Sequence, residues 1–313
     1  MIKKMTNKTH IEGIVYEHDL EVKVSGPDSK APNTEFITGT LSIATDNAIT
    51  NIVPVHFTYV TAKTAKGTEN NTYNVLKGII DGVIPNYMDK GDLAGKVRID
   101  SAIGANEFYT DRSGKEELVS AKRNEGGFVH TCNVLNEAEN TRNTFECDMV
   151  ITNVIHKEAD DERQLPEKAI IKGFVFDFKN ALVPVEFSAV HPGAIAYYES
   201  LGVSSNNPIF TKVWGVQISE TVVRTITEES AWGEPSVREV KSSRRDFVIT
   251  GSSKELPEQD NTEQSISYVD LKEALAAREI YLATIKQRQD EYKAKKNATP
   301  AIAVTPTASA FNF

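Results

Sequence analysis

The sequence predicts a mainly β protein that consists of two similar five-stranded barrels, a C-terminal helix and a disordered tail. A strand–turn–strand unit occurs twice: I-T-G at residues 37–39 precedes V-P-V-H-F at 53–57, and I-K-G at 171–173 precedes V-P-V-E-F at 183–187. A helical pattern and then another strand pattern follow each copy. A supersecondary unit that recurs in the same order indicates a duplicated domain.

The elements of the first half follow from hydrophobic periodicity. Residues 1–8 are expected to be a loose arm. The next strand is expected to run over residues 11–24 and to bury its even-numbered side chains, because apolar residues alternate there from Ile14 to Val24. Further strand patterns cover residues 35–43 and 53–59, a helix is predicted over 73–83, and two or three strands follow with a hairpin at 112–115.

The second half repeats this order, which is strand, strand, strand, helix, strand, with room for a fifth strand. That is the order of an oligonucleotide/oligosaccharide-binding (OB) barrel, so we expect two tandem OB-like barrels. The predicted division is a first barrel over residues 9–140, a second over 144–252, an acidic linker over 253–267, a helix over 268–297 and a disordered tail over 298–313.

Composition narrows the functional classes. The net charge of −9 argues against a simple basic wrapper of nucleic acid, although a basic groove can coexist with acidic surfaces elsewhere. No apolar run is long enough to span a bilayer, so no membrane partner is expected. We expect a cytoplasmic protein, in the host cytoplasm if the chain is viral, because its basic N-terminus lacks the apolar stretch of a signal peptide.

No enzyme and no cofactor are predicted. The sequence contains no glycine-rich phosphate loop, no H-E-x-x-H and no G-x-S-x-G. Cys132 and Cys147 have only His130 nearby, which makes no zinc ligand set. We interpret the two cysteines as buried thiols in a reducing compartment, with pairing in an oxidising one as the alternative.

Two phenylalanines of the second copy are candidate residues for stacking on nucleic acid bases. Alignment of the two glycines places Phe174 and Phe176 opposite Thr40 and Ser42, on the predicted outward face. Outward aromatic rings on such strands are suited to stacking bases. In the alternative interpretation both rings lie in the core, which keeps the charged Asp177 outside.

Further candidates are aromatic residues with basic neighbours and separate basic pairs, since a cation can hold phosphate while a ring stacks on a base. They lie near the first hairpin, in the fourth and fifth strands of either half, and in a Gly-Pro loop. The set is Phe108, Tyr109, Arg112, Lys115, Lys122, Arg123, Lys212, Trp214, Trp232, Arg244 and Arg245.

These features together resemble the single-stranded DNA-binding proteins of DNA replication, especially those of bacteriophages. The resemblance rests on the duplicated I-x-G…V-P-V-x-F units, the helix after the third strand and the tail. It implies that the C-terminal tip recruits replication or recombination proteins, here through Phe311 and Phe313. The family pattern has an acidic run before this tip, and none precedes it here.

The leading hypothesis is a protein without catalytic activity that coats single-stranded DNA, without sequence preference, during replication or recombination. The alternative is a structural or assembly protein, for example of a virion, whose barrels bind other subunits. The helix over residues 268–297 has an apolar seam that includes Arg278 and Gln289. It is expected either to pack on the second barrel or to mediate self-association.

Overall fold

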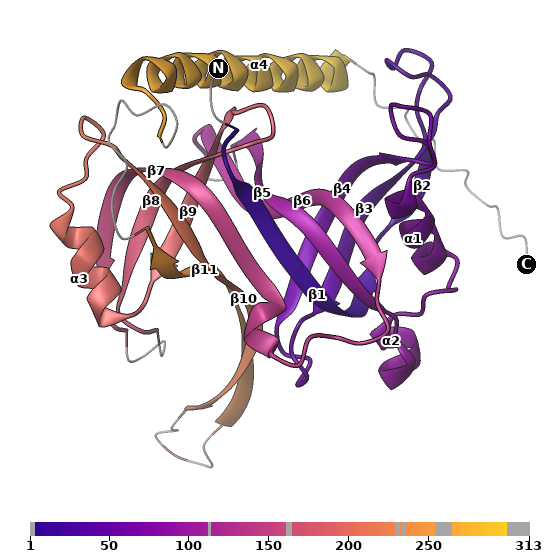
Figure 1. Ribbon diagram of the computed structural model, residues 1–313, viewed down its shortest axis with the longest axis horizontal. Helices are drawn as coiled ribbons and strands as arrows, with labels where there is room; N and C mark the ends of the chain where they lie inside the picture. The colour runs from indigo at the N-terminus through magenta and orange to yellow at the C-terminus, as the bar shows by residue number, and fades with distance from the viewer. Residues whose placement is uncertain are drawn as a thin grey trace, which may run out of the picture.

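The computed structural model describes residues 4–111, 114–160, 165–228, 232, 236–253 and 265–298. These residues form a mainly β protein with a long C-terminal helix, as predicted (Figure 1). The strands are β1 (Asn7–His18), β2 (Glu21–Val24), β3 (Glu35–Ala44), β4 (Ile52–Thr61), β5 (Lys96–Thr110), β6 (Glu117–Thr131), β7 (Asn143–Lys157), β8 (Lys168–Phe176), β9 (Leu182–Ala189), β10 (Ile209–Glu228) and β11 (Ser236–Ser252). The α-helices are α1 (Asn71–Ile80), α2 (Tyr87–Lys90), α3 (Pro192–Ser200) and α4 (Tyr268–Ala298).

Five strands of each half pair in a closed ring. In the first half the ring runs β1–β3–β4–β6–β5 and back to β1, and β4 and β6 are parallel. In the second half it runs β7–β8–β9–β11–β10 and back to β7, and β9 and β11 are parallel. The two rings meet in a seam where β1 pairs with β7, from Asn7 opposite Cys147 to Ile11 opposite Asn143. One continuous sheet therefore passes through both halves.

The two V-P-V-x-F strands, β4 and β9, occupy corresponding places in the rings. Phe57 lies opposite Gly39, whereas Phe187 lies opposite Ile171 and not opposite Gly173. The predicted equivalence of the two glycines is therefore wrong by two residues. The turn of the first hairpin is two residues longer than that of the second, but the distance in sequence from the glycine to V-P-V-x-F is four residues longer. The two glycines therefore lie at different positions relative to the motif on the neighbouring strand.

Before its bulge, β1 buries the opposite set of side chains from the predicted one, whereas the even-numbered Leu20, which follows β1, is buried as predicted. Ile11 and Val15 belong to the core of the first ring, while Ile14 and Tyr16 are half-buried. A bulge between Val15 and Glu17 shifts the register with β3, and a bulge reverses the alternation of side chains across it. Because the alternation of apolar residues in the sequence is continuous, it predicts neither the bulge nor the separate, exposed strand β2.

Each ring has its own apolar core, and a helix covers it. In the first core, Phe57 of β4 and Leu76 of α1 are fully buried. In the second, Phe187 of β9 and Tyr198 of α3 are buried. The Asn70 side chain caps α1 by accepting the N–H of Thr72 at 3.2 Å. The predicted helices after the third strand of each half are thus confirmed. None of the helices in the described residues is long and apolar enough to cross a membrane.

Polar side chains join the two rings beside the seam. Gln217 of β10 is buried, and its side-chain oxygen accepts a hydrogen bond from Asn124 of β6 at 2.7 Å. Asn51, in the turn before β4, donates to the Gln217 carbonyl at 3.2 Å and accepts the N–H of Ser219 at 2.6 Å. Buried amide hydrogen bonds fix the orientation of one ring against the other, because leaving their donors or acceptors unpaired is costly.

Candidate functional site

Helix α4 lies across the top of the molecule in Figure 1, and its start packs on the outer face of the second ring. Val175 points into the core of that ring, and its neighbours Phe174 and Phe176 point outward, as the first of the two alternatives predicted. Phe176 is nevertheless fully buried, because it belongs to an apolar cluster with Leu182, Phe210 and Leu271 at the start of α4. Phe174 is half-buried beside Arg278, whose guanidinium lies 5.6 Å from the ring centroid. These rings anchor α4 in this arrangement and are not free to stack on bases.

The rest of α4 is held by polar contacts to the β5–β6 hairpin of the first half. The guanidinium of Arg278 donates to both carboxylate oxygens of Glu107, at 2.5 and 3.1 Å, and to the Leu182 carbonyl at 3.1 Å. Gln289 pairs with the backbone N–H and C=O of Tyr109 at 3.0 and 2.7 Å. Arg278 and Gln289, the two polar residues within the apolar stripe predicted for this helix, thus attach α4 to the first ring. Helix α4 therefore joins both halves.

A cavity of about 1440 Å³ lies between the two rings beneath α4. We call it the central cleft. Its lining comes from residues 4–8 at the N-terminus, 58–60 of β4, 102–105 and 107 of β5, 125–127 of β6, 176–183 of the β8–β9 hairpin, and Ala274, Ala277, Arg278 and Tyr281 of α4. It is larger than the usual range of about 300–1,000 Å³ for small-molecule pockets. The space suits an extended ligand better than a small one.

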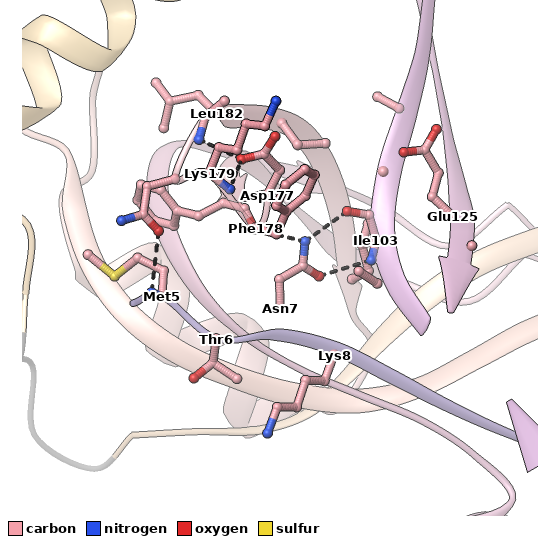
Figure 2. Close-up of a pocket in the computed structure, with 18 of the residues that line it drawn as sticks. Met5, Thr6, Asn7, Lys8, Ile103, Glu125, Asp177, Phe178, Lys179 and Leu182 are labelled. Carbon is pink, nitrogen blue, oxygen red and sulfur yellow. Dashed lines mark hydrogen bonds between the residues drawn. The ribbon is translucent and has the colours of Figure 1, made fainter. Parts of the chain in front are cut away.

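The N-terminal segment forms one wall of the central cleft (Figure 2). The Asn7 amide donates to the Ile103 carbonyl at 2.8 Å and to the Phe176 carbonyl at 2.9 Å, and its oxygen accepts the N–H of Ile103 at 2.9 Å. The Asp148 carboxylate accepts the N–H of Thr6 at 2.7 Å. Residues 4–8 are therefore held between both rings, and the prediction of a loose arm over residues 1–8 is wrong for this part.

Free positive charge and exposed aromatic surface meet in the central cleft. Lys4, Lys8 and Lys179 line it, Lys8 from its edge with a side chain directed to the other side of β1 (Figure 2). Among the described residues none of the three is in an ion pair, and the Lys179 ammonium lies 5.2 Å from the Phe178 centroid. The aromatic side chains there are half-exposed Tyr59, exposed Phe178 and half-exposed Tyr281. The three acidic side chains are already engaged: Glu107 binds Arg278, Glu125 binds Arg123, and Asp177 accepts backbone N–H groups within its own turn.

The residues predicted from sequence lie in several separate places. Phe108, Tyr109 and Lys115 lie at the β5–β6 hairpin beside α4, and Arg123 of β6 is paired with Glu125. Lys212 is paired with Glu146, and this hydrogen-bonded carboxylate raises the Lys212 pKa. Exposed Trp232 and Arg244 and Arg245 of β11 lie on the long β10–β11 hairpin. Arg112, Phe311 and Phe313 fall outside the described residues. Among the predicted residues that the structure describes, Phe176 alone lines the central cleft, and Trp214 lines a second groove.

Lys122, predicted to contact phosphate, joins the two rings instead. It extends from β6 onto the aromatic cluster of the second ring, with its ammonium 4.4 Å from the Phe247 centroid and 5.3 Å from that of Phe187. It donates a hydrogen bond to the Glu186 carbonyl. Burial lowers the pKa of Lys122 from 10.5 to about 8, and the nearby Asp246 opposes that shift. The lysine is therefore part of the contact between the halves.

The Lys122 ammonium, packed against Phe187 and Phe247, is expected to make the stability of the protein depend on pH. Above pH 8 the folded chain releases this proton, whereas the unfolded chain keeps it up to about pH 10.5. The unfolded state then binds more protons, so the contribution of Lys122 to stability rises between these pH values. We expect the wild type to gain stability relative to Lys122→Met over this range, measured as the difference in free energy of unfolding in urea. A constant difference from pH 7 to 10.5 would show that Lys122 titrates normally.

Sequence reasoning missed most of the cleft. No motif in the sequence distinguishes Lys4, Lys8 or Lys179 from other lysines, and Tyr59 and Tyr281 lie on elements far apart in the chain. The one available signal was the density of lysine just before the first strand. Within the described parts of the chain, no group of three or more histidine, cysteine, aspartate or glutamate side chains is placed to hold a metal ion.

Comparison with known proteins identifies a family. No curated protein matches this chain significantly. The YorF family matches residues 5–288, which include both rings and most of α4. Because this match extends over far more than half of the sequence, the chain belongs to the YorF family.

Proposed function

We propose that this protein binds single-stranded DNA, without sequence preference, in the central cleft, and coats it during replication or recombination. The observation that carries the proposal is the combination of three lysines without acidic partners and three accessible aromatic rings in one extended cavity. Proteins that bind single strands combine cations that follow the backbone with rings on which successive bases stack. The acidic total charge does not oppose this, because the acidic side chains of the cleft are engaged.

The proposal includes two tandem OB-like barrels. Each ring joins its first, second, third, fifth and fourth strands and returns to the first, and a helix lies between the third and fourth. This strand order supports an OB-type assignment. A fold of this type hosts many functions, so it is the contents of the cleft that support binding of nucleic acid.

The proposal is tested by fluorescence anisotropy with labelled oligothymidylate across a salt series. The logarithm of affinity is expected to fall linearly with the logarithm of salt, at about 0.7 per phosphate neutralised on a single strand. Replacing Lys4, Lys8 and Lys179 together with glutamine is expected to reduce the slope by about 2, since three phosphate contacts are lost.

A matched control replaces three lysines outside the cleft, Lys23, Lys30 and Lys157, with glutamine. This control keeps the change in net charge and is expected to leave most of the slope intact. Equal losses in both triple variants, equal affinity for duplex and single strand, or no binding at low salt would contradict the proposal.

An assembly protein remains the second candidate, and the β10–β11 hairpin favours it. Beyond Glu220, β10 has β11 as its sole strand partner among the described residues, from Thr221 opposite Ser243 to Glu228 opposite Ser236. This part projects from the body of the protein (Figure 1). A two-stranded ribbon alone is only marginally stable in water, which favours contact with another chain. Absence of strand binding together with a stable oligomer in light scattering would favour this candidate.

A further inference from the structure

A second groove crosses the seam between the rings. It has a volume of about 1020 Å³, and its lining includes Lys8 and His10 of β1, Phe128 of β6, Glu146 of β7 and Trp214 of β10. We call it the seam groove. Successive residues of a strand point to opposite faces, and Figure 2 shows Asn7 directed toward Ile103 in the central cleft and Lys8 directed to the other side of β1. The seam groove thus lies on the far side of the sheet from Asn7.

Two aromatic rings are displayed at the two sides of the seam groove. Phe128 is 70% exposed and Trp214 is 42% exposed. Large apolar side chains that are exposed together in a groove mark binding sites more often than isolated ones do. A local feature of the backbone holds each of these two side chains in its exposed position.

A β-bulge presents Phe128. Gly126 and Gly127 have φ values of +59° and +118°, which other residues adopt with strain, and the β5–β6 register shifts between Asp100 and Ala102. A Cβ on Gly127 would lie 2.3 Å from the Asp100 carbonyl oxygen. Bulges of this kind redirect side chains and are frequent beside binding sites.

A glycine supports Trp214. Its indole lies against Gly251 of β11, where a Cβ would be 2.4 Å from Nε1. Protein therefore covers one side of the indole, and the remaining exposed surface is held in a fixed orientation. Such an arrangement lowers the entropy lost when a flat ligand stacks on it.

The floor of the seam groove, between Phe128 and Trp214, is polar, and most of its charged side chains are paired. Phe128, Asp100, His10, Thr144 and Val216 form one row across five neighbouring strands, and Trp214 lies two residues beyond Val216 on the same face. Four strand spacings place the two aromatic columns at most about 19 Å apart. His10 Nδ1 lies 3.0 Å from the Asp100 carboxylate, and Glu146 is paired with Lys212, so Lys8 is the unpaired cation among the described residues of this floor.

We propose that the seam groove is a second stacking subsite for the same single strand that occupies the central cleft, an inference that rests on the proposed function. Unpaired bases stack on Phe128 and Trp214, and Lys8 lies at the junction because it lines both cavities. Gly126 and Gly127 line the cleft just before Phe128 enters the groove, and Ser101 of the groove adjoins Ala102 of the cleft. A bound strand therefore passes from beneath α4 around the start of β1 to the other face of the sheet.

The chain offers a direct probe of this subsite. It has two tryptophans, so Trp232→Phe leaves Trp214 as the sole one, and stacking of a base on the indole quenches its fluorescence. In this background an oligothymidylate of about 30 nucleotides, longer than the roughly 4–16 that one OB site covers, is expected to quench Trp214 as it binds. Phe128→Ala is expected to weaken binding of the long strand by about tenfold, within the range for loss of one stacked base.

Tyr292→Ala is the matched control, because Tyr292 is also largely exposed and lines neither cavity. Folding is expected to tolerate both alanine variants since both rings are on the surface. Strand binding without quenching of Trp214, or equal affinities of the Phe128→Ala and Tyr292→Ala variants, would overturn the seam subsite and leave the central cleft as the sole site. Absence of strand binding in every variant, the unsubstituted chain included, would overturn the proposed function itself.

Discussion

Replacing Phe187 with alanine is expected to lower the free energy of unfolding by about 3–5 kcal/mol. Phe187 is the last residue of the second V-P-V-x-F motif, lies within β9 and is fully buried. Its ring lies 5.0 Å from that of Phe145 and 5.9 Å from that of Phe247, between centroids. Truncation removes apolar contacts with both rings and leaves a cavity, and the surrounding β-strands relax only in part. It also removes one of the two rings under the Lys122 ammonium.

Urea unfolding followed by circular dichroism measures this effect, and Phe178→Ala provides the control. Phe178 lies in the same half of the chain, but its ring is 81% exposed, so its loss is expected to change stability by no more than about 0.5 kcal/mol. Similar losses in both variants would mean that Phe187 does not stabilise a packed core. The corresponding residue of the first copy, Phe57, is equally buried and is expected to behave as Phe187 does.

Arg278→Met is expected to weaken the attachment of α4 by about 3–5 kcal/mol, the range for removing one partner of a buried ion pair. The Arg278 and Glu107 side chains are 9% and 4% exposed, so the substitution leaves the Glu107 carboxylate buried without its partner. The Leu182 carbonyl loses a hydrogen bond as well. Amide hydrogen exchange along α4 should therefore accelerate strongly, because the helix detaches more often from the β5–β6 hairpin.

Lys293→Met is the matched control for Arg278→Met. Lys293 is paired with Asp111 at 3.3 Å, but their side chains are 41% and 71% exposed. An exposed ion pair contributes about 0–1 kcal/mol, so exchange along α4 is expected to change little. The double variant Glu107→Gln, Arg278→Met is expected to recover part of the loss, since it no longer buries an unpaired charge. Equal exchange in all three variants would show that the Arg278 pair does not hold α4.

The duplicated elements could be predicted because their signals are local. The alternation around V-P-V-x-F and the helix after each copy depend on neighbouring residues, and both are present in the structure. The register of Gly39 and Gly173 could not be predicted, because a bulge and a turn of different length change the alignment without changing the pattern. The same reason explains the inverted face of β1, where a bulge after Val15 is invisible in the alternation.

The site was less predictable than the fold because it depends on which charges find partners. Lys122 and Lys212 were good candidates by composition, yet one lies on buried rings and the other on Glu146. One of the two interpretations placed Phe174 and Phe176 on the outward face, but α4, nearly a hundred residues later, packs against them there. Trp214, in contrast, remains accessible beside a groove. Contacts between segments distant in the sequence determine whether each of these side chains is accessible, and a periodic pattern does not predict such contacts.

The pairing of β1 with β7 makes the two halves depend on each other during synthesis. Residues 7–11 of β1 pair with β5 on one side and with β7 on the other, so the first ring leaves the ribosome with one edge of its opening strand unpaired. Such an edge is a template for pairing with other chains until β7 arrives and covers it. Either half expressed alone would keep this edge exposed. The pairing joins the two halves through one strand, and we expect either half expressed alone to aggregate more than the whole chain does.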